Sequence, residues 1–247
     1  MISTFFHAVF YNPIYNALVA LVALVPGGDV GLAVVLLTII IRLVLLPFSL
    51  SAARTQRAMR HLEPSLKELK EKHKGDKEQE ALATLALYRE AKVNPFASVL
   101  TVFIQLPVLL ALYWVFRYEP FTMLDSARLY AFTPVPHVIS PQFFGFFAIT
   151  SKSIVLAALA GATQYLQAHL ALSGGTPAPT RGPADFQKMM GMQLKFVFPV
   201  LIAIISYTTG AAVALYFVTT NVVGILQEWH VRRKLSAEFG ASPAQSS

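Results

Sequence analysis

The stretch "LLTIIIRLVLLP", Leu36 to Pro47, places one arginine within a run of aliphatic side chains. Arg42 is the twelfth residue of the apolar segment 31–50, and about twenty such residues cross the hydrocarbon of a bilayer. Its guanidinium would therefore lie near the midplane. The end of the segment is about eight residues away at about 1.5 Å per residue, which is farther than the side chain reaches. Burying such a charge costs about 2.5–3.5 kcal/mol on insertion scales. We therefore expect a spanning helix whose arginine faces protein or water.

The composition as a whole is that of a membrane protein. Hydrophobic residues make up 55% of the 247 residues and charged residues only 13%, whereas soluble domains carry about a quarter charged residues. Windows of spanning length predict an all-α membrane protein with five transmembrane helices. These are 31–50, 96–116, 154–172, 194–209 and 211–228, with the last two separated by little more than Gly210 and forming a tight hairpin. The chain contains no cysteine, which excludes disulfides and thiol chemistry.

Residues 1–30 contain one further apolar stretch, residues 4–25, which is nearly long enough to span. Polar side chains recur at helical spacing on one side of its first half, and they are His7, Tyr11, Asn12, Tyr15 and Asn16. This pattern predicts an extracytoplasmic amphipathic helix lying at the membrane interface, with a sixth span as the alternative. Without a basic n-region or a small-residue cleavage site, it is not expected to be a removable signal peptide.

The orientation follows from the lysines and arginines of the connections. Residues 51–95 hold ten of them, and the connections on that side hold sixteen in all, against three on the opposite side. The positive-inside rule therefore places the N-terminus outside and the C-terminus in the cytoplasm, with residues 235–247 as a flexible tail. Because the net charge of +7 arises from these connections, we do not expect a direct nucleic-acid function.

The polar region 51–95 predicts a cytoplasmic helical hairpin with its turn at Gly75–Asp76. Pro64 interrupts the first arm, because proline lacks the amide proton that a continuous helix needs. Each arm carries one apolar stripe at helical spacing: Leu62, Leu66 and Leu69, then Leu82, Leu85 and Tyr88. The two stripes can pack on each other, dock onto a partner, or do both.

No carboxylate is available inside the membrane to neutralise Arg42, since every Asp and Glu lies in a connection or at the end of a segment. An unpaired guanidinium needs water or an incoming anion, which predicts an open, wet cavity. Thr38 and Ser49 would share the helix face of Arg42. Similar polar positions in other spans would complete a hydrophilic groove, and they include Thr101, Gln105, Gln164 and Tyr216, together with Gln167 and Thr220. For each serine and threonine the alternative is ordinary hydrogen bonding within a helix bundle.

The sequence lacks the motifs of common enzymes. There is no HExxH, no GxSxG, no pair of intramembrane aspartates and no Gly-rich phosphate loop, and the spacing of the six histidines suits no common metal site. We therefore expect no enzymatic activity, no cofactor and no metal.

Four segments resemble the YidC/Oxa/Alb family of membrane-protein insertases over about residues 10–234. They are "GLAVVLLTIIIRLVLLP" (31–47), "LALYREAKVNP" (85–95), "VFIQLPVLLALYWVF" (102–116) and "ALYFVTTNVVGILQ" (214–227). The resemblance implies four further spans within residues 96–234 and a groove open to the cytosol and to lipid. It also implies that Arg42 attracts acidic or hydrophilic parts of a nascent chain. Thr38, Gln105 and Tyr216 match substrate-contact positions, whereas Phe217 stands where many members have a second tyrosine.

The expected function is thus that of a membrane insertase and chaperone in the bacterial inner or plasma membrane, without the large periplasmic domain of Gram-negative members. Its partners would be nascent membrane proteins and lipid, and the Sec translocon and the ribosome stay open as further partners. Two other functions also stay open: a small transporter or channel that uses Arg42 as an anion site, and a folding chaperone that does not insert.

Overall fold

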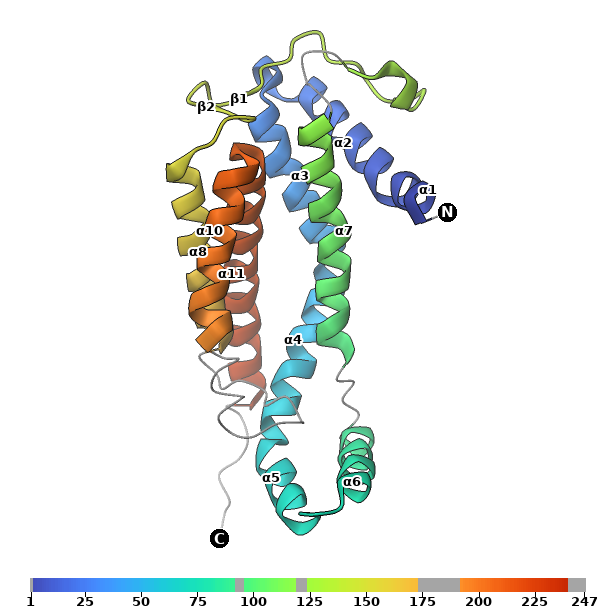
Figure 1. Cartoon of the computed structure of the whole chain (residues 1–247), viewed down its shortest axis with the longest axis vertical. Helices are drawn as coiled ribbons and strands as arrows, with labels where there is room; N and C mark the ends of the chain where they lie inside the picture. The colour runs from blue at the N-terminus through green and yellow to red at the C-terminus, as the bar shows by residue number, and fades with distance from the viewer. Residues whose placement is uncertain (1, 92–95, 119–123, 173–191, 240–247) are drawn as a thin grey trace.

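A computed structural model describes residues 2–91, 96–118, 124–172 and 192–239. Its long helices form two groups that run along the long axis of the molecule (Figure 1). One group contains α3 (Val30–Val44), α4 (Leu46–His61) and α7 (Phe96–Tyr118), and the other contains α8 (Ile154–Leu172), α10 (Phe198–Thr209) and α11 (Ala211–Phe239). Helix α11 packs against α8 and α10 and also against α3 and α7, so it joins the two groups.

By length and composition, three described helical stretches can cross a membrane: Thr4–Leu24, Ile154–Ala171 and Ala211–His230. The bent pair Val30–Val44 and Leu46–Ala52 makes a fourth, and the shorter apolar helices are Leu106–Tyr118 and Lys195–Thr209. The protein is therefore a mainly helical, multi-pass membrane protein, as predicted. The number of five spans stays a prediction, because these lengths and compositions support three or four.

The predicted first span is not one straight helix. Helix α3 ends at Val44, and α4 starts at Leu46 with its axis turned by 58°. Pro47 accounts for the break, because it has no amide proton for the carbonyl four residues earlier and its ring crowds that carbonyl. The expectation of an unbroken helix through residues 31–50 was wrong in this respect.

The N-terminal helix consists of α1 (Ile2–Phe6), the π-helical turn η1 (His7–Tyr11) and α2 (Asn12–Leu24), and it runs obliquely to α3 and α7 (Figure 1). Most of its polar side is buried rather than presented to water: Tyr11, Tyr15 and Asn16 are at most 4% exposed. The connection between α7 and α8 covers that side. The polar periodicity is therefore explained by contacts within the protein.

This connection, described over residues 124–153, contains the turn η3 (Ser126–Arg128) and the two-residue strands β1 (Gln142–Phe143) and β2 (Phe147–Ala148). It also holds helix ends in place. Asp29 caps α3 by accepting from the Leu32 amide at 2.8 Å, and its second oxygen accepts from the Phe144 amide at 2.7 Å. The carbonyl of Ile149 accepts from the Ala212 amide at 3.0 Å at the start of α11.

The hairpin of α10 and α11 is tight, as predicted. Gly210 separates the two helices with a φ of +112°, a backbone conformation that residues with a Cβ rarely adopt. The amide of Ala211 donates to the carbonyl of Ser151 at 3.0 Å. An otherwise unpaired helix end is therefore closed by the 124–153 connection.

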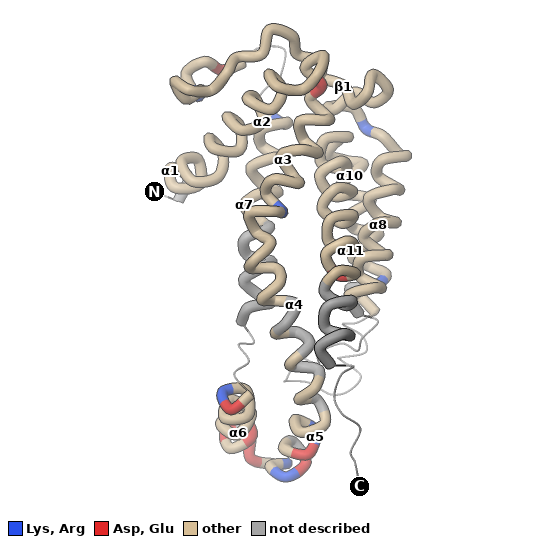
Figure 2. The backbone as a smooth tube through the Cα atoms, turned by 180° about the vertical axis from the view of Figure 1, so that it is seen from behind, with Lys and Arg blue, Asp and Glu red and all other residues tan. Residues whose placement is uncertain are grey.

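The charged hairpin lies at the opposite end of the molecule from this connection (Figure 2). It consists of α5 (Glu63–Lys72) and α6 (Lys77–Glu90), and Asp76 caps α6 by accepting from the amides of Glu78 and Gln79. The predicted turn and the interruption near Pro64 are both confirmed. The predicted packing of the stripes is confirmed only in part, because Leu66 and Tyr88 are buried whereas Leu82 and Leu85 are 66% and 53% exposed.

Candidate functional site

Arg42 lies in the last turn of α3, and its side chain is half-buried. Its Nε atom is buried without a hydrogen-bond partner among the described residues, and no carboxylate of this part of the chain pairs with it. The break at Leu45 has a favourable consequence, because it brings the negative end of the α3 dipole to the guanidinium. Such placement stabilises a cation by about 0.3–1 kcal/mol, which is small beside the cost of burying a charge without a partner.

Helix α11 supplies the neighbouring polar groups. Tyr216 and Thr220 lie one turn apart and are 2% and 5% exposed. Tyr216 interacts electrostatically with Arg42, and its hydroxyl approaches that of Thr220. This approach falls short of good hydrogen-bond geometry, since Thr220 Oγ1 has no partner that meets it among the described residues. The interface of α3 and α11 therefore holds a cation and two hydroxyls within apolar surroundings.

The hydroxyls of Thr38 and Ser49 each donate to a backbone carbonyl four residues earlier, not to another helix as the alternative of bundle hydrogen bonding expected. The Thr38 hydroxyl donates to the Val34 carbonyl at 2.7 Å and is buried, and the Ser49 hydroxyl donates to the Leu45 carbonyl at 3.1 Å. Thr38 is one turn from Arg42 on the same helix. Ser49 belongs to α4, beyond the bend, so it does not continue the face that Thr38 and Arg42 share.

The other predicted groove residues are Gln164 on α8 and Thr101 and Gln105 on α7. Gln164 is half-buried on α8, which packs on α10 and α11 and has no substantial packing with α3. The side chains of Thr101 and Gln105 lie outside the described part of the chain. Their place in the site stays a prediction.

A second polar cluster joins α8 to α11, and its central residue, Asn221, was not among the predicted site residues. Asn221 is 1% exposed, and its amide donates to the Ala160 carbonyl at 3.3 Å and to the Thr163 hydroxyl at 3.1 Å. Close by, the side chain of Gln167 occupies the space that a Cβ on Gly224 would need. The signal for this cluster in the sequence is an asparagine within an apolar window, because a buried amide requires hydrogen-bond partners.

The Arg42 cluster can attract an anion or a polar backbone segment. A guanidinium donates charge-assisted hydrogen bonds, and tyrosine and threonine hydroxyls both donate and accept. In apolar surroundings these interactions are stronger than in water. The described residues contain no cluster of three histidine, cysteine, aspartate or glutamate side chains that would hold a metal.

The fold and this cluster define a class: a helical multi-pass membrane protein with a cationic polar site between its apolar helices. A family model described as "60Kd inner membrane protein" matches residues 22–238. The membrane protein insertase YidC of Fusobacterium nucleatum is 30% identical over 207 residues, which cover 84% of this chain and 88% of that protein. The YidC proteins of Ectopseudomonas mendocina and Francisella philomiragia are 31% and 33% identical over 89% and 85% of this chain. The chain spans only about a third of the length of these last two, since the matches cover 33% and 34% of them.

The chain belongs to the YidC/Oxa/Alb family of membrane protein insertases. The resemblance seen in its sequence is thereby confirmed. Its family and its apolar helices make it a multi-pass protein of the bacterial inner membrane. The family is not a known class of enzymes, which agrees indirectly with the absence of catalytic motifs.

Proposed function

We propose that this protein takes hydrophobic segments of newly made proteins from the cytosol into the lipid bilayer, through a hydrated, cytosol-open groove that contains Arg42. The observation that carries the proposal is the buried Nε of Arg42, which has no partner among the described residues and lies in the same cluster as Tyr216. An uncompensated charge within an apolar bundle is retained at a cost of several kcal/mol, which favours a functional role for it.

The mechanism is solvation rather than covalent chemistry. Moving a polar tail across hydrocarbon is unfavourable because its charges and backbone groups lose water. A wet groove shortens the dry path, and Arg42 attracts acidic groups of the tail more strongly where the local dielectric is low. The apolar helix of the substrate then leaves the groove for lipid, and this burial drives the step forward.

The proposed orientation places the charged hairpin of α5 and α6 in the cytosol and the 124–153 connection outside. The support is the distribution of lysine and arginine, because the hairpin region carries ten of them and residues 1–30 carry none. The groove would then receive chains from the side of the hairpin. Contacts of the hairpin with a Sec translocon or a ribosome are part of this proposal.

The test is insertion of a single-span substrate with an acidic N-tail into liposomes that contain the purified full chain. We expect Arg42→Ala to reduce insertion by roughly ten- to a hundredfold, since a charge-assisted contact of about 1.5–3 kcal/mol is lost. Arg42→Glu should reduce it further by repulsion, and Arg42→Lys should keep much of the activity because the charge remains. A substrate with a neutral tail should be much less sensitive to all three changes.

Arg117→Ala is the matched control, because it removes an exposed arginine from the end of α7. Insertion at the parental rate by both Arg42→Ala and Arg42→Glu would exclude the electrostatic part of the mechanism. A flux of inorganic anions through the same liposomes that disappears in Arg42→Ala would instead support a channel.

A further inference from the structure

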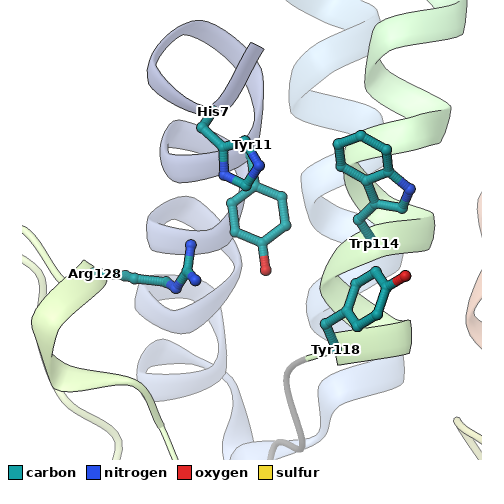
Figure 3. A pocket seen from close by; sticks show the side chains of 5 residues that line it. All are labelled: His7, Tyr11, Trp114, Tyr118 and Arg128. Atoms are coloured by element: carbon teal, nitrogen blue, oxygen red, sulfur yellow. The ribbon is translucent and has the colours of Figure 1, made fainter. Parts of the chain in front are cut away.

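A second polar site lies away from Arg42, where the N-terminal helix, the end of α7 and the 124–153 connection meet. It is a cavity of about 320 Å³. Its lining comes from three segments (Figure 3): His7 and Tyr11, then Trp114 and Tyr118, then Arg128. It shares no residue with the Arg42 cluster, and the proposed function does not use it.

The lining has one chemical property in common. Each of its five side chains can donate a hydrogen bond through an imidazole, phenol, indole or guanidinium group, and none of them is a carboxylate. Such a set selects a ligand that is rich in acceptor oxygens. Ring contacts make one wall of the cavity rigid. The His7 ring packs at a tilt against the rings of Tyr11 and Trp114, with centroid distances of 4.8 and 6.0 Å.

Arg128 is held in a defined position. Its Nε donates to Asp125 at 2.8 Å, and its guanidinium lies over the Tyr11 ring at 5.4 Å from the centroid. A guanidinium presents several donors in a rigid fork, so it can engage a carboxylate and a phosphate together. The cavity therefore combines an oriented cation with aromatic walls.

The surroundings indicate where the ligand comes from. The two helices that supply four of the lining residues also expose large apolar side chains, at Phe5 and Val9 and at Leu106 and Leu110, which are 45–63% exposed. Tryptophan and tyrosine beside such surfaces are typical of the headgroup level of a membrane. Acyl chains can lie against the exposed apolar side chains while a headgroup enters the cavity.

We propose that this cavity binds the phosphodiester headgroup of a membrane phospholipid, with Arg128 and the lining hydroxyl, indole and imidazole groups donating to its oxygens. The volume is at the lower end of small-ligand sites, which run from about 300 to 1,000 Å³, and suits a headgroup rather than a whole lipid. Binding would fasten the N-terminal helix and the connection to one membrane surface. This proposal stands whether or not Arg42 drives insertion.

The chain itself provides the reporter for a test. It has two tryptophans, so in the full chain carrying Trp229→Phe the emission of Trp114 reports on the cavity alone. The protein in detergent is titrated with a short-chain phosphatidylglycerol, with the diacylglycerol of the same chains, and with inorganic phosphate. We expect a saturable change with phosphatidylglycerol and none with the other two.

Two variants in this background locate the interaction. Arg128→Gln should weaken the apparent affinity by about tenfold, since a charge-assisted contact is lost. Tyr118→Phe removes one donor from a 69% exposed side chain and should weaken it by about twofold to threefold. Lys152→Gln is the control, since it neutralises an exposed cation of the same connection that is not part of the cavity lining, and it should bind like the parent.

Several results would overturn the proposal. Saturation by diacylglycerol would exclude recognition of the phosphate, and saturation by inorganic phosphate alone would exclude a lipid as the source. Parental affinity in both variants, or no saturable change at all, would exclude the site. Size-exclusion profiles check the folding of each variant, and Tyr118→Phe decides the question if Arg128→Gln does not fold.

Discussion

Asn221 illustrates how a single amide can set the position of two helices. Its side chain on α11 donates to a backbone carbonyl and to the Thr163 hydroxyl of α8, in a site that is almost fully buried. Within a membrane few other partners exist for these groups, although measured energies of such bonds remain modest.

We expect Asn221→Ala to lower the free energy of unfolding by about 1 kcal/mol, because the amide and its two partners lose their bonds. Reversible unfolding in mixed micelles measures this difference. Val222→Ala is the control, since that side chain is 41% exposed on the same helix. An equal loss in the control would assign the effect to helix packing in general.

Asn16 performs a similar role for the 124–153 connection. Its Oδ1 accepts from the Tyr130 amide and the Thr133 hydroxyl, both at 2.7 Å, and its Nδ2 donates to the carbonyls of Asn12 and Arg128 at 2.8 and 2.9 Å. One side chain thus uses all its capacity for hydrogen bonds. Tyr15 adds a contact, since its hydroxyl accepts from the Asp125 amide at 3.0 Å.

Asn16→Ala should lower the free energy of unfolding of the connection by about 2 kcal/mol, because two of its backbone groups, the Arg128 carbonyl and the Tyr130 amide, lose this partner. Hydrogen exchange of peptides covering residues 124–133 should become faster. Asn12→Ala offers a matched control one turn away, since Asn12 Oδ1 is buried without a partner among the described residues. Equal acceleration in both variants would contradict a specific role for Asn16.

At the scale of elements, α3 and α4 show which features of the fold can be predicted from the sequence and which cannot. Long apolar windows and a dense run of charges predict helices and a hairpin well, because burial and charge are properties of local sequence. Pro47 also indicates a bend, but the long apolar run around it predicts a continuous spanning helix. Ser49 lies beyond the bend, so it does not share the helical face of Thr38 and Arg42, since a helical face does not continue across a break.

The neighbours of each helix could not be predicted in the same way. Periodicity shows that a helix has a polar side but not what covers it. For the N-terminal helix the cover is a connection more than 100 residues later, as in the bond between Asn16 and Thr133. For Gln164 the structure shows that its helix packs on α10 and α11, and its place in the groove stays a prediction.

Replacing Pro47 tests the origin of the bend. In Pro47→Ala residue 47 regains an amide proton for the carbonyl of Leu43, so α3 and α4 should become more nearly collinear. The absence of cysteine allows clean spin labelling, at Ile40→Cys and Ser51→Cys, both of which are exposed positions. The distance between the labels should increase in Pro47→Ala. An unchanged distance would mean that packing of α4 on α7 holds the bend.

For the whole molecule, the position of the N-terminal helix decides the arrangement in the membrane. The stretch Thr4–Leu24 is long and apolar enough to span. Its middle, however, bonds to the 124–153 connection through Tyr15 and Asn16. If the helix spanned, its middle would lie near the midplane and would draw irregular backbone of the connection into the membrane, where unpaired amides and carbonyls are costly. The cost of exposing these backbone groups to hydrocarbon favours the interfacial position.

Labelling of single cysteines in intact cells tests that position and the orientation together. Ser126→Cys in the connection should react with a membrane-impermeant maleimide, and Ser65→Cys in the hairpin should react only after the membrane is opened, because the charged hairpin is retained in the cytosol. Both positions are exposed. Thr4→Cys distinguishes the two models of the N-terminal helix. An interfacial helix keeps residue 4 on the side of Ser126, so Thr4→Cys should react without opening the membrane. If the helix spans, Thr4→Cys should react only after the membrane is opened, as Ser65→Cys does.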